Sequence, residues 1–254
     1  MNFELKALDL SGAANEKCDA LIVLLHDAFK PEKDALSTLV TQTRKAGDLD
    51  PKPGKFLSIY RPSGAACSMA ILAGIGDGSV QQVRKAITAA VGAVKGDKLK
   101  KLVICFASSP SEESVRCAVT TVAEASYVFT ATKSKPEGRT IQRVVVCLSD
   151  AAKFKNTFNH ARAVVAGIEL AKEWGNRPAN HATPSLLAGA ARALSKLPNI
   201  KCEIHGPKEV AKLKMGSFLA VAQGSDEPLR FIVLRYEGAA KKEAPTVLVG
   251  KGIT

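Results

Sequence analysis

Short apolar runs alternate with segments of helical periodicity through the first 150 residues, and this alternation constrains the fold more than any other feature. The runs are apolar on successive positions, which is typical of strands buried on both faces. In residues 79–95, apolar side chains recur at three- and four-residue steps, so that one stripe of the helix can face a sheet. The alternation predicts a three-layer α/β domain over residues 1–150. The expected strands are 21–25, 55–61, 68–75, 101–107 and 143–149, and the expected helices are 34–47, 79–95 and 112–130.

A long helix is predicted from about Thr157 to Trp174, where Gly175 and Pro178 would end it. Val164, Ile168, Ala171 and Trp174 are expected on one face of this helix. We expect a domain boundary near residue 150, a connector helix over residues 151–175, and a second domain over 176–254.

The second domain is predicted to open with a helix, because Thr183 is a good N-cap and Pro184 suits the first helical position. An alternating strand is expected at 199–206 and a short basic helix at 207–214. Three apolar runs follow, at 218–224, 230–238 and 246–250.

The N-terminal segment, the lack of a long apolar stretch and the cysteines indicate a soluble, cytoplasmic protein. Glu4, Lys6 and Asp9 interrupt the first segment, so it resembles no signal peptide, and no uncharged apolar stretch approaches 18 residues. The six cysteines form no CxxC pair, and we expect them to be reduced thiols with mainly structural roles.

A formal charge of +12 raises the alternative of a DNA-binding or regulatory protein. Aromatic residues make up only 5% of the chain, which leaves little to stack on bases. The cations are also dispersed, so nucleic acid is not the favoured partner. Three small groups stand out: Lys98, Lys100 and Lys101; Lys133, Lys135 and Arg139; Lys208, Lys212 and Lys214.

The glycine-rich stretch Gly74–Ser79 reads GIGDGS and lies between a predicted strand and a predicted helix. Its spacing is GxGxG rather than the GxGxxG of dinucleotide-binding turns. The favoured interpretation is a tight turn, and a macro-like nucleotide-binding module is the alternative. Among the histidines, none of which has metal-ligand spacing, His181 has the most site-like position, in a loop.

Three stretches resemble leucyl aminopeptidases of the M17 metallopeptidase family. WGNRPANHATPSLLAGAARAL (174–194) resembles the NxPxN…TP segment that opens the family's catalytic domain. MGSFLAVAQGSDEPLRFIVLRYEG (215–238) is similar to a second family segment, and VLVGKGIT (247–254) to the start of its metal-site signature.

The resemblance implies an N-terminal α/β domain of macro type, followed by an α/β catalytic domain that binds two divalent metal ions, Zn²⁺ or Mn²⁺. Family members form hexamers and remove N-terminal residues, often leucine, from peptides. The resemblance makes Lys251 a metal ligand and places the carboxylate ligands and catalytic residues beyond Thr254. We therefore expect a truncated catalytic domain, and an inactive protein if these 254 residues stand alone.

Lysine is an unusual ligand, because only the neutral amine has a lone pair to donate. Lowering its pKa from about 10.4 to below neutrality costs about 4–5 kcal/mol. Burial at a strand end and a nearby dication both act in that direction, and Gly250 and Gly252 would allow close approach. The sequence therefore predicts that Lys251 ends a buried strand. A P-loop is excluded, since Pro245 and Gly252 occupy positions where that motif needs glycine and Ser or Thr.

Overall fold

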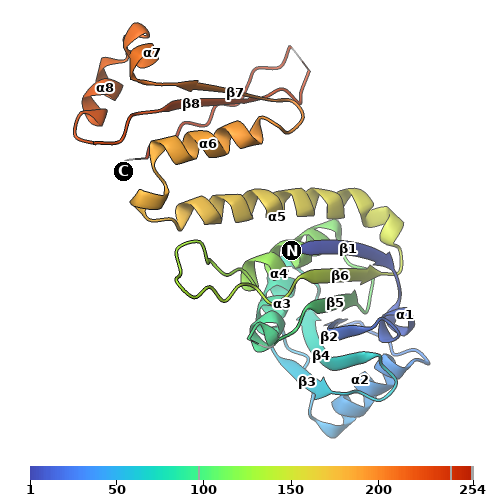
Figure 1. The fold of residues 1–254 in the computed structure, drawn as a ribbon. Coiled ribbons are helices and arrows are strands. Elements are labelled where there is room, and N and C mark those ends of the chain that lie inside the picture. The colour runs from blue at the N-terminus through green and yellow to red at the C-terminus, as the bar shows by residue number, and fades with distance from the viewer. Residues whose placement is uncertain (97, 241, 253–254) are drawn as a thin grey trace. The chain divides into compact units, whose positions relative to one another are not determined.

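A computed structural model of the chain describes residues 1–96, 98–240 and 242–252. The chain forms two compact units (Figure 1). The first consists of Met1–Thr130 and Lys135–Lys172, and the second of Ala131–Ser134 and Glu173–Thr254. Most of the long helix therefore belongs to the first unit.

The first unit is built on a six-stranded sheet in the order β1-β6-β5-β2-β4-β3. All neighbours are parallel except β3 and β4. The five predicted strands are confirmed, and β1 adds an edge strand that the sequence analysis did not expect. The strands are β1 (Asn2–Ala7), β2 (Cys18–His26), β3 (Phe56–Tyr60), β4 (Cys67–Gly76), β5 (Lys101–Phe106) and β6 (Arg143–Leu148).

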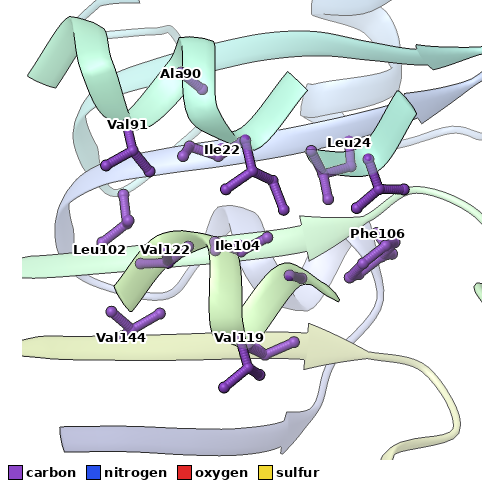
Figure 2. Close-up of a cluster of buried hydrophobic side chains, with 14 of the residues drawn as sticks. Ile22, Leu24, Ala90, Val91, Leu102, Ile104, Phe106, Val119, Val122 and Val144 are labelled. Atoms are coloured by element: carbon purple, nitrogen blue, oxygen red, sulfur yellow. The ribbon is translucent and has the colours of Figure 1, made fainter. Parts of the chain in front are cut away.

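Helices cover both faces of this sheet, which confirms the three-layer prediction. One apolar cluster packs α3 (Val80–Val94), α4 (Glu112–Ala125) and α5 (Lys155–Gly175) against one face, with the short 3₁₀ turn Ala151–Phe154 beside them. A second cluster packs α1 (Leu10–Ala14) and α2 (Ala35–Ala46) against the other. Figure 2 shows Val91 of α3 and Val119 of α4 among side chains from β2, β5 and β6.

Two details of the predicted helices are wrong. Helix α4 stops at Ala125 rather than at residue 130. At this end the Arg139 guanidinium donates hydrogen bonds to the carbonyls of Ala123 and Ser126. Helix α5 buries Phe158, Ala161 and Val165, whereas Ile168 is 41% exposed. The buried face contains Phe158 and Val165 and therefore lies one position away from the predicted face, which contained Val164.

The second unit contains a two-stranded antiparallel sheet of β7 (Ile200–His205) and β8 (Phe231–Tyr236). Its helices are α6 (Pro184–Leu194), α7 (Pro207–Lys212) and α8 (Gly216–Ala222), which forms from the apolar run at 218–224. The predicted cap is confirmed, since the Thr183 side chain accepts a hydrogen bond from the Leu186 amide at 3.4 Å. No helix in the described part of the chain is long and apolar enough to cross a bilayer.

Candidate functional site

The segment that carries Lys251 has no regular secondary structure and is exposed to solvent. Residues 246–250 form neither helix nor strand, and Lys251 is exposed. Leu248 and Val249 are 93% and 92% exposed. The expectation that Lys251 ends a buried strand is therefore wrong for this structure. The physical reason is that a strand needs a neighbour for its amides and carbonyls, and no described strand pairs with this run.

The metal-binding capacity of the described residues is small. Among them, no group of three or more His, Cys, Asp or Glu side chains could hold a metal ion. The Lys251 amine is a single potential ligand, and one nitrogen does not retain a divalent cation. The described residues alone therefore do not fit a two-metal centre, and no chemical step can be derived through one.

The turn between α5 and α6 holds the first stretch of family-like sequence. The Arg177 guanidinium forms an ion pair with Glu173 at 2.9 Å and lies 4.2 Å from the centre of the Trp174 ring. His181, in the 3₁₀ turn Ala179–His181, is exposed, and its main-chain carbonyl accepts from Arg177 at 3.5 Å. These contacts connect residues of the turn, but they place no ionisable side chain beside the His181 imidazole.

The turn Gly74–Ser79 is a tight strand-to-helix connection. A Cβ atom on Gly74 would lie 1.6 Å from the carbonyl oxygen of Pro51, and Gly76 and Gly78 have φ of +52° and +75°. The three amides that follow Gly76 are already used. Asp77 donates to Gln82 at 3.1 Å, Gly78 to Ile75 at 2.8 Å, and Ser79 to Asp77 at 2.9 Å. A phosphate would have to displace these bonds, so the glycines are explained by the turn.

Two cations of the three basic groups form ion pairs within the first unit. The Lys101 ammonium lies 2.6 Å from Glu16, and Arg139 lies 2.6 Å from Glu169. Lys208, Lys212 and Lys214 are exposed around the short helix α7. The formal charge thus includes cations held in internal ion pairs, which does not favour the DNA-binding alternative.

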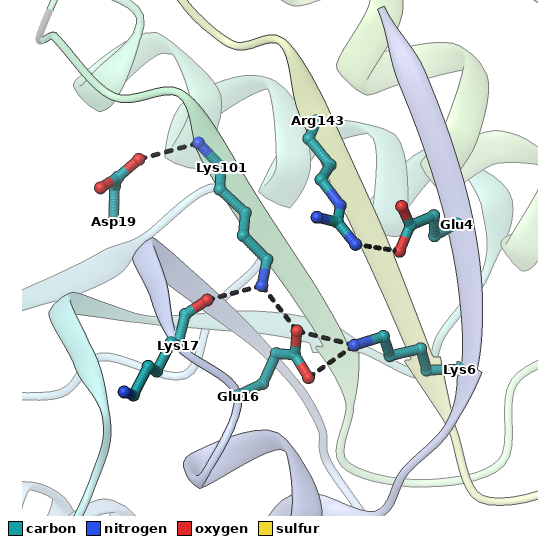
Figure 3. A network of polar contacts seen from close by, with 7 residues as sticks. All are labelled: Glu4, Lys6, Glu16, Lys17, Asp19, Lys101 and Arg143. Carbon is teal, nitrogen blue, oxygen red and sulfur yellow. Dashed lines mark hydrogen bonds and ion pairs between the residues drawn. The ribbon is translucent and has the colours of Figure 1, made fainter.

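A polar network at the start of β2 was not foreseen from the sequence. Glu16 accepts from Lys6 of β1 and Lys101 of β5, while Asp19 accepts from the Lys101 amide at 2.8 Å (Figure 3). The two ammonium groups hold the pKa of Glu16 below its usual range. Apolar residues alternate with polar ones in NFELKA, and this pattern could have predicted β1 and the position of Lys6 in it.

Comparisons with known proteins relate both units to one family. Residues 24–136 match the profile described as "Cytosol aminopeptidase family, N-terminal domain". Residues 169–254 match the profile described as "Cytosol aminopeptidase family, catalytic domain".

Curated relatives match over the entire chain. It is 67% identical to a "Probable cytosol aminopeptidase" of Albidiferax ferrireducens over 254 residues, 53% of that protein. It is 53% identical to a protein of the same name from Verminephrobacter eiseniae, over 49% of that protein. The chain thus spans about half the length of the curated relatives it matches.

Solved structures share the fold at low sequence identity. A mutant of tomato leucine aminopeptidase matches with a TM-score of 0.73 and 22% identity, over 92% of this chain and 50% of that one. The bottromycin maturation enzyme BotP matches with a TM-score of 0.67 and 20% identity, over 85% of this chain and 46% of that one. With both domain profiles matched in order, the chain belongs to the cytosol aminopeptidase family.

Proposed function

We propose that the whole protein is a metal-dependent aminopeptidase that removes N-terminal residues from peptides, with a preference of the leucine type. The observation that carries the proposal is 67% identity, along all 254 residues, to a probable cytosol aminopeptidase. Identity at this level along the whole chain supports the same type of activity in both proteins.

In this proposal, residues 1–150 are the N-terminal domain, residues 151–175 a connector and residues 176–254 the beginning of the catalytic domain. The relatives are about twice as long as this chain, and we place the remaining metal ligands in the part that the chain does not span. Residues 1–254 would then be inactive alone.

Lys251 is the proposed metal ligand of this chain. Its support is the VGKGIT motif, together with the exposed apolar run before it. An apolar run of this kind is typical of a buried strand, which other parts of the whole protein would cover. In the whole protein Lys251 would hold one ion of a two-metal centre, and such a centre would supply Lewis-acid chemistry for peptide hydrolysis. One solved relative is titled as a complex with Mn, which supports divalent metal use but leaves Zn²⁺ and Mn²⁺ as alternatives here.

The proposed setting is a cytoplasmic homohexamer acting on peptides. The relatives' name supports the cytosol. Ile168 on α5 is 41% exposed, and we propose that its side chain contributes to an interface between subunits of the whole protein. Light scattering of the whole protein tests the assembly, and a monomer would contradict it.

The decisive experiment measures hydrolysis of leucine p-nitroanilide by the whole protein and by residues 1–254. We expect turnover by the whole protein that a chelator abolishes and that Mn²⁺ or Zn²⁺ restores. Residues 1–254 should show none under the same conditions. Metal-dependent turnover by residues 1–254 would overturn the placement of the metal ligands outside this chain. Absence of turnover by the metal-loaded whole protein, tested with several aminoacyl substrates, would overturn the activity itself.

A further inference from the structure

Two pairs of cysteines face each other across the strands of the six-stranded sheet. Cys18 is the first residue of β2, Cys67 is the first residue of β4, and the two are direct partners in the parallel register. Cys105 of β5 and Cys147 of β6 are partners in the same way. All four side chains pack in the apolar cluster beneath α1 and α2, so each pair projects from the same face of the sheet. All four are free thiols.

The backbone geometry of both pairs is compatible with a disulfide. Neighbouring strands lie about 4.8 Å apart, and Cα atoms of disulfide-bonded cysteines are usually about 4.4–6.8 Å apart. Burial separates the two pairs. Cys105 and Cys147 are 0% exposed, whereas Cys18 is half-buried and Cys67 is 6% exposed at the rim of the sheet. A small oxidant in solvent can therefore reach the rim pair and not the core pair.

The electrostatics favour the rim pair as well. A hydrogen bond between the side chains lowers the pKa of Cys67 and raises the pKa of Cys18, so the pair shares one proton after losing the other. The Cys18 thiol therefore keeps its proton and shares it with the Cys67 sulfur, so Cys67 is the sulfur that is deprotonated first. Burial raises the pKa of Cys105 and brings that of Cys147 to about 12. Since the thiolate is the nucleophile, the rim pair is the reactive one.

We propose that Cys18 and Cys67 form a site of reversible oxidation by peroxides, in which a disulfide ties β2 to β4. The Cys67 thiolate attacks one oxygen of hydrogen peroxide and the O–O bond breaks, so that a sulfenic acid forms on Cys67 while the departing hydroxide takes up a proton and leaves as water. The Cys18 sulfur then attacks the Cys67 sulfur and gives up its proton, and a second water leaves, so two thiols are oxidised and one hydrogen peroxide is reduced. A small thiol restores the pair by exchange through a mixed disulfide.

The experiment treats the folded chain with hydrogen peroxide, quenches it, unfolds it and alkylates the remaining thiols. Of the six cysteines, we expect four to be alkylated, with Cys18 and Cys67 recovered as one cross-linked peptide. Dithiothreitol before alkylation should restore all six. Cys202 provides an internal comparison, because it is half-buried but faces Leu234 and has no partner thiol.

Two variants complete the design. Cys18→Ser should abolish the cross-link and leave a sulfenic acid on Cys67 that dimedone traps, whereas Cys147→Ser should leave the Cys18–Cys67 cross-link intact. The unmodified chain decides the question even if a variant fails to fold. Full alkylation after peroxide, oxidation of Cys67 without the link, or a Cys105–Cys147 link that forms as fast would each overturn the proposal.

Discussion

The Nζ atom of Lys101 lies 2.6 Å from the Oε1 atom of Glu16, a carboxylate that also receives Lys6 at 2.8 Å. The Glu16 side chain is only 14% exposed. Through these contacts Glu16, two residues before β2, joins β1 and β5, which are not neighbours in the sheet. Hydrogen bonds from Lys101 and then from Lys6 are the main causes that lower the pKa of Glu16.

We expect Glu16→Gln to lower the free energy of unfolding by about 1–2 kcal/mol at pH 7, since both ammonium groups lose their partner. The folded-state pKa of Glu16 is lowered. Its stabilisation is therefore present above the unfolded pKa of about 4.3 and is lost as the pH falls through the folded value. The difference between wild type and Gln should close on going from pH 7 to below pH 4. Urea unfolding followed by circular dichroism measures it.

Glu124→Gln is the matched control for Glu16. Its pair with Arg84 is 3.1 Å long, but the two side chains are 56% and 52% exposed, so water screens the pair. We expect a change below about 0.5 kcal/mol. Equal losses in the two variants would show that the Glu16 network adds nothing beyond an ordinary surface pair.

Gly74→Ala should destabilise the first unit by about 3 kcal/mol or more, because the new methyl group would lie 1.6 Å from the Pro51 carbonyl oxygen. This neighbour is main chain and can yield only if β4 or the residue 51 segment moves. The control is Gly92→Ala in α3, where nothing lies within 4 Å of the added carbon. That substitution should stabilise by about 0.5–1 kcal/mol. Thermal unfolding compares the two, and a harmless Gly74→Ala would contradict the close approach.

Arg139→Lys should loosen the end of α4. The guanidinium donates to the carbonyls of Ser126 and Ala123, both at 3.0 Å, and lies 2.6 Å from Glu169. An ammonium on a flexible stem cannot hold these three positions together. We expect faster amide hydrogen exchange over the last turn of α4 and a loss of about 1–2 kcal/mol. Arg143→Lys, whose side chain is 46% exposed, serves as control. Unchanged exchange at α4 would refute the capping role.

The sequence predicts the three-layer unit well because each layer leaves a periodic trace. Val83, Ile87 and Val91 recur at helical spacing and are all buried against the sheet. Strand β1 leaves a weaker trace, since Glu4 and Lys6 on this edge strand interrupt its apolar residues. Register leaves no trace at all. The pairing of Cys18 with Cys67 depends on how β2 and β4 align across 48 intervening positions, which no local pattern encodes.

The candidate metal site was predictable only by resemblance. The run before Lys251 is apolar enough for a buried strand, but strand formation also needs a partner, and within the described residues it has none. The same run is thus compatible with two environments. The motif around Lys251 is the basis of the proposed metal-binding role, whereas the conformation of the run depends on the chain that packs beside it.

Lys251→Ala in the whole protein should reduce leucine p-nitroanilide hydrolysis by about 10²-fold or more, with the fold intact. Loss of a residue that only supports a metal ligand already costs about 10–100-fold in affinity or activity, so loss of a ligand should cost at least as much. Lys251→Arg should fare no better, because a guanidinium stays protonated and offers no lone pair. Metal content after dialysis gives a second readout, and both variants should retain less metal than wild type. Lys242→Ala is the control, since that exposed lysine lies in the same segment without the flanking glycines. Activity near wild type in Lys251→Arg, with full metal content, would remove Lys251 from the proposed site.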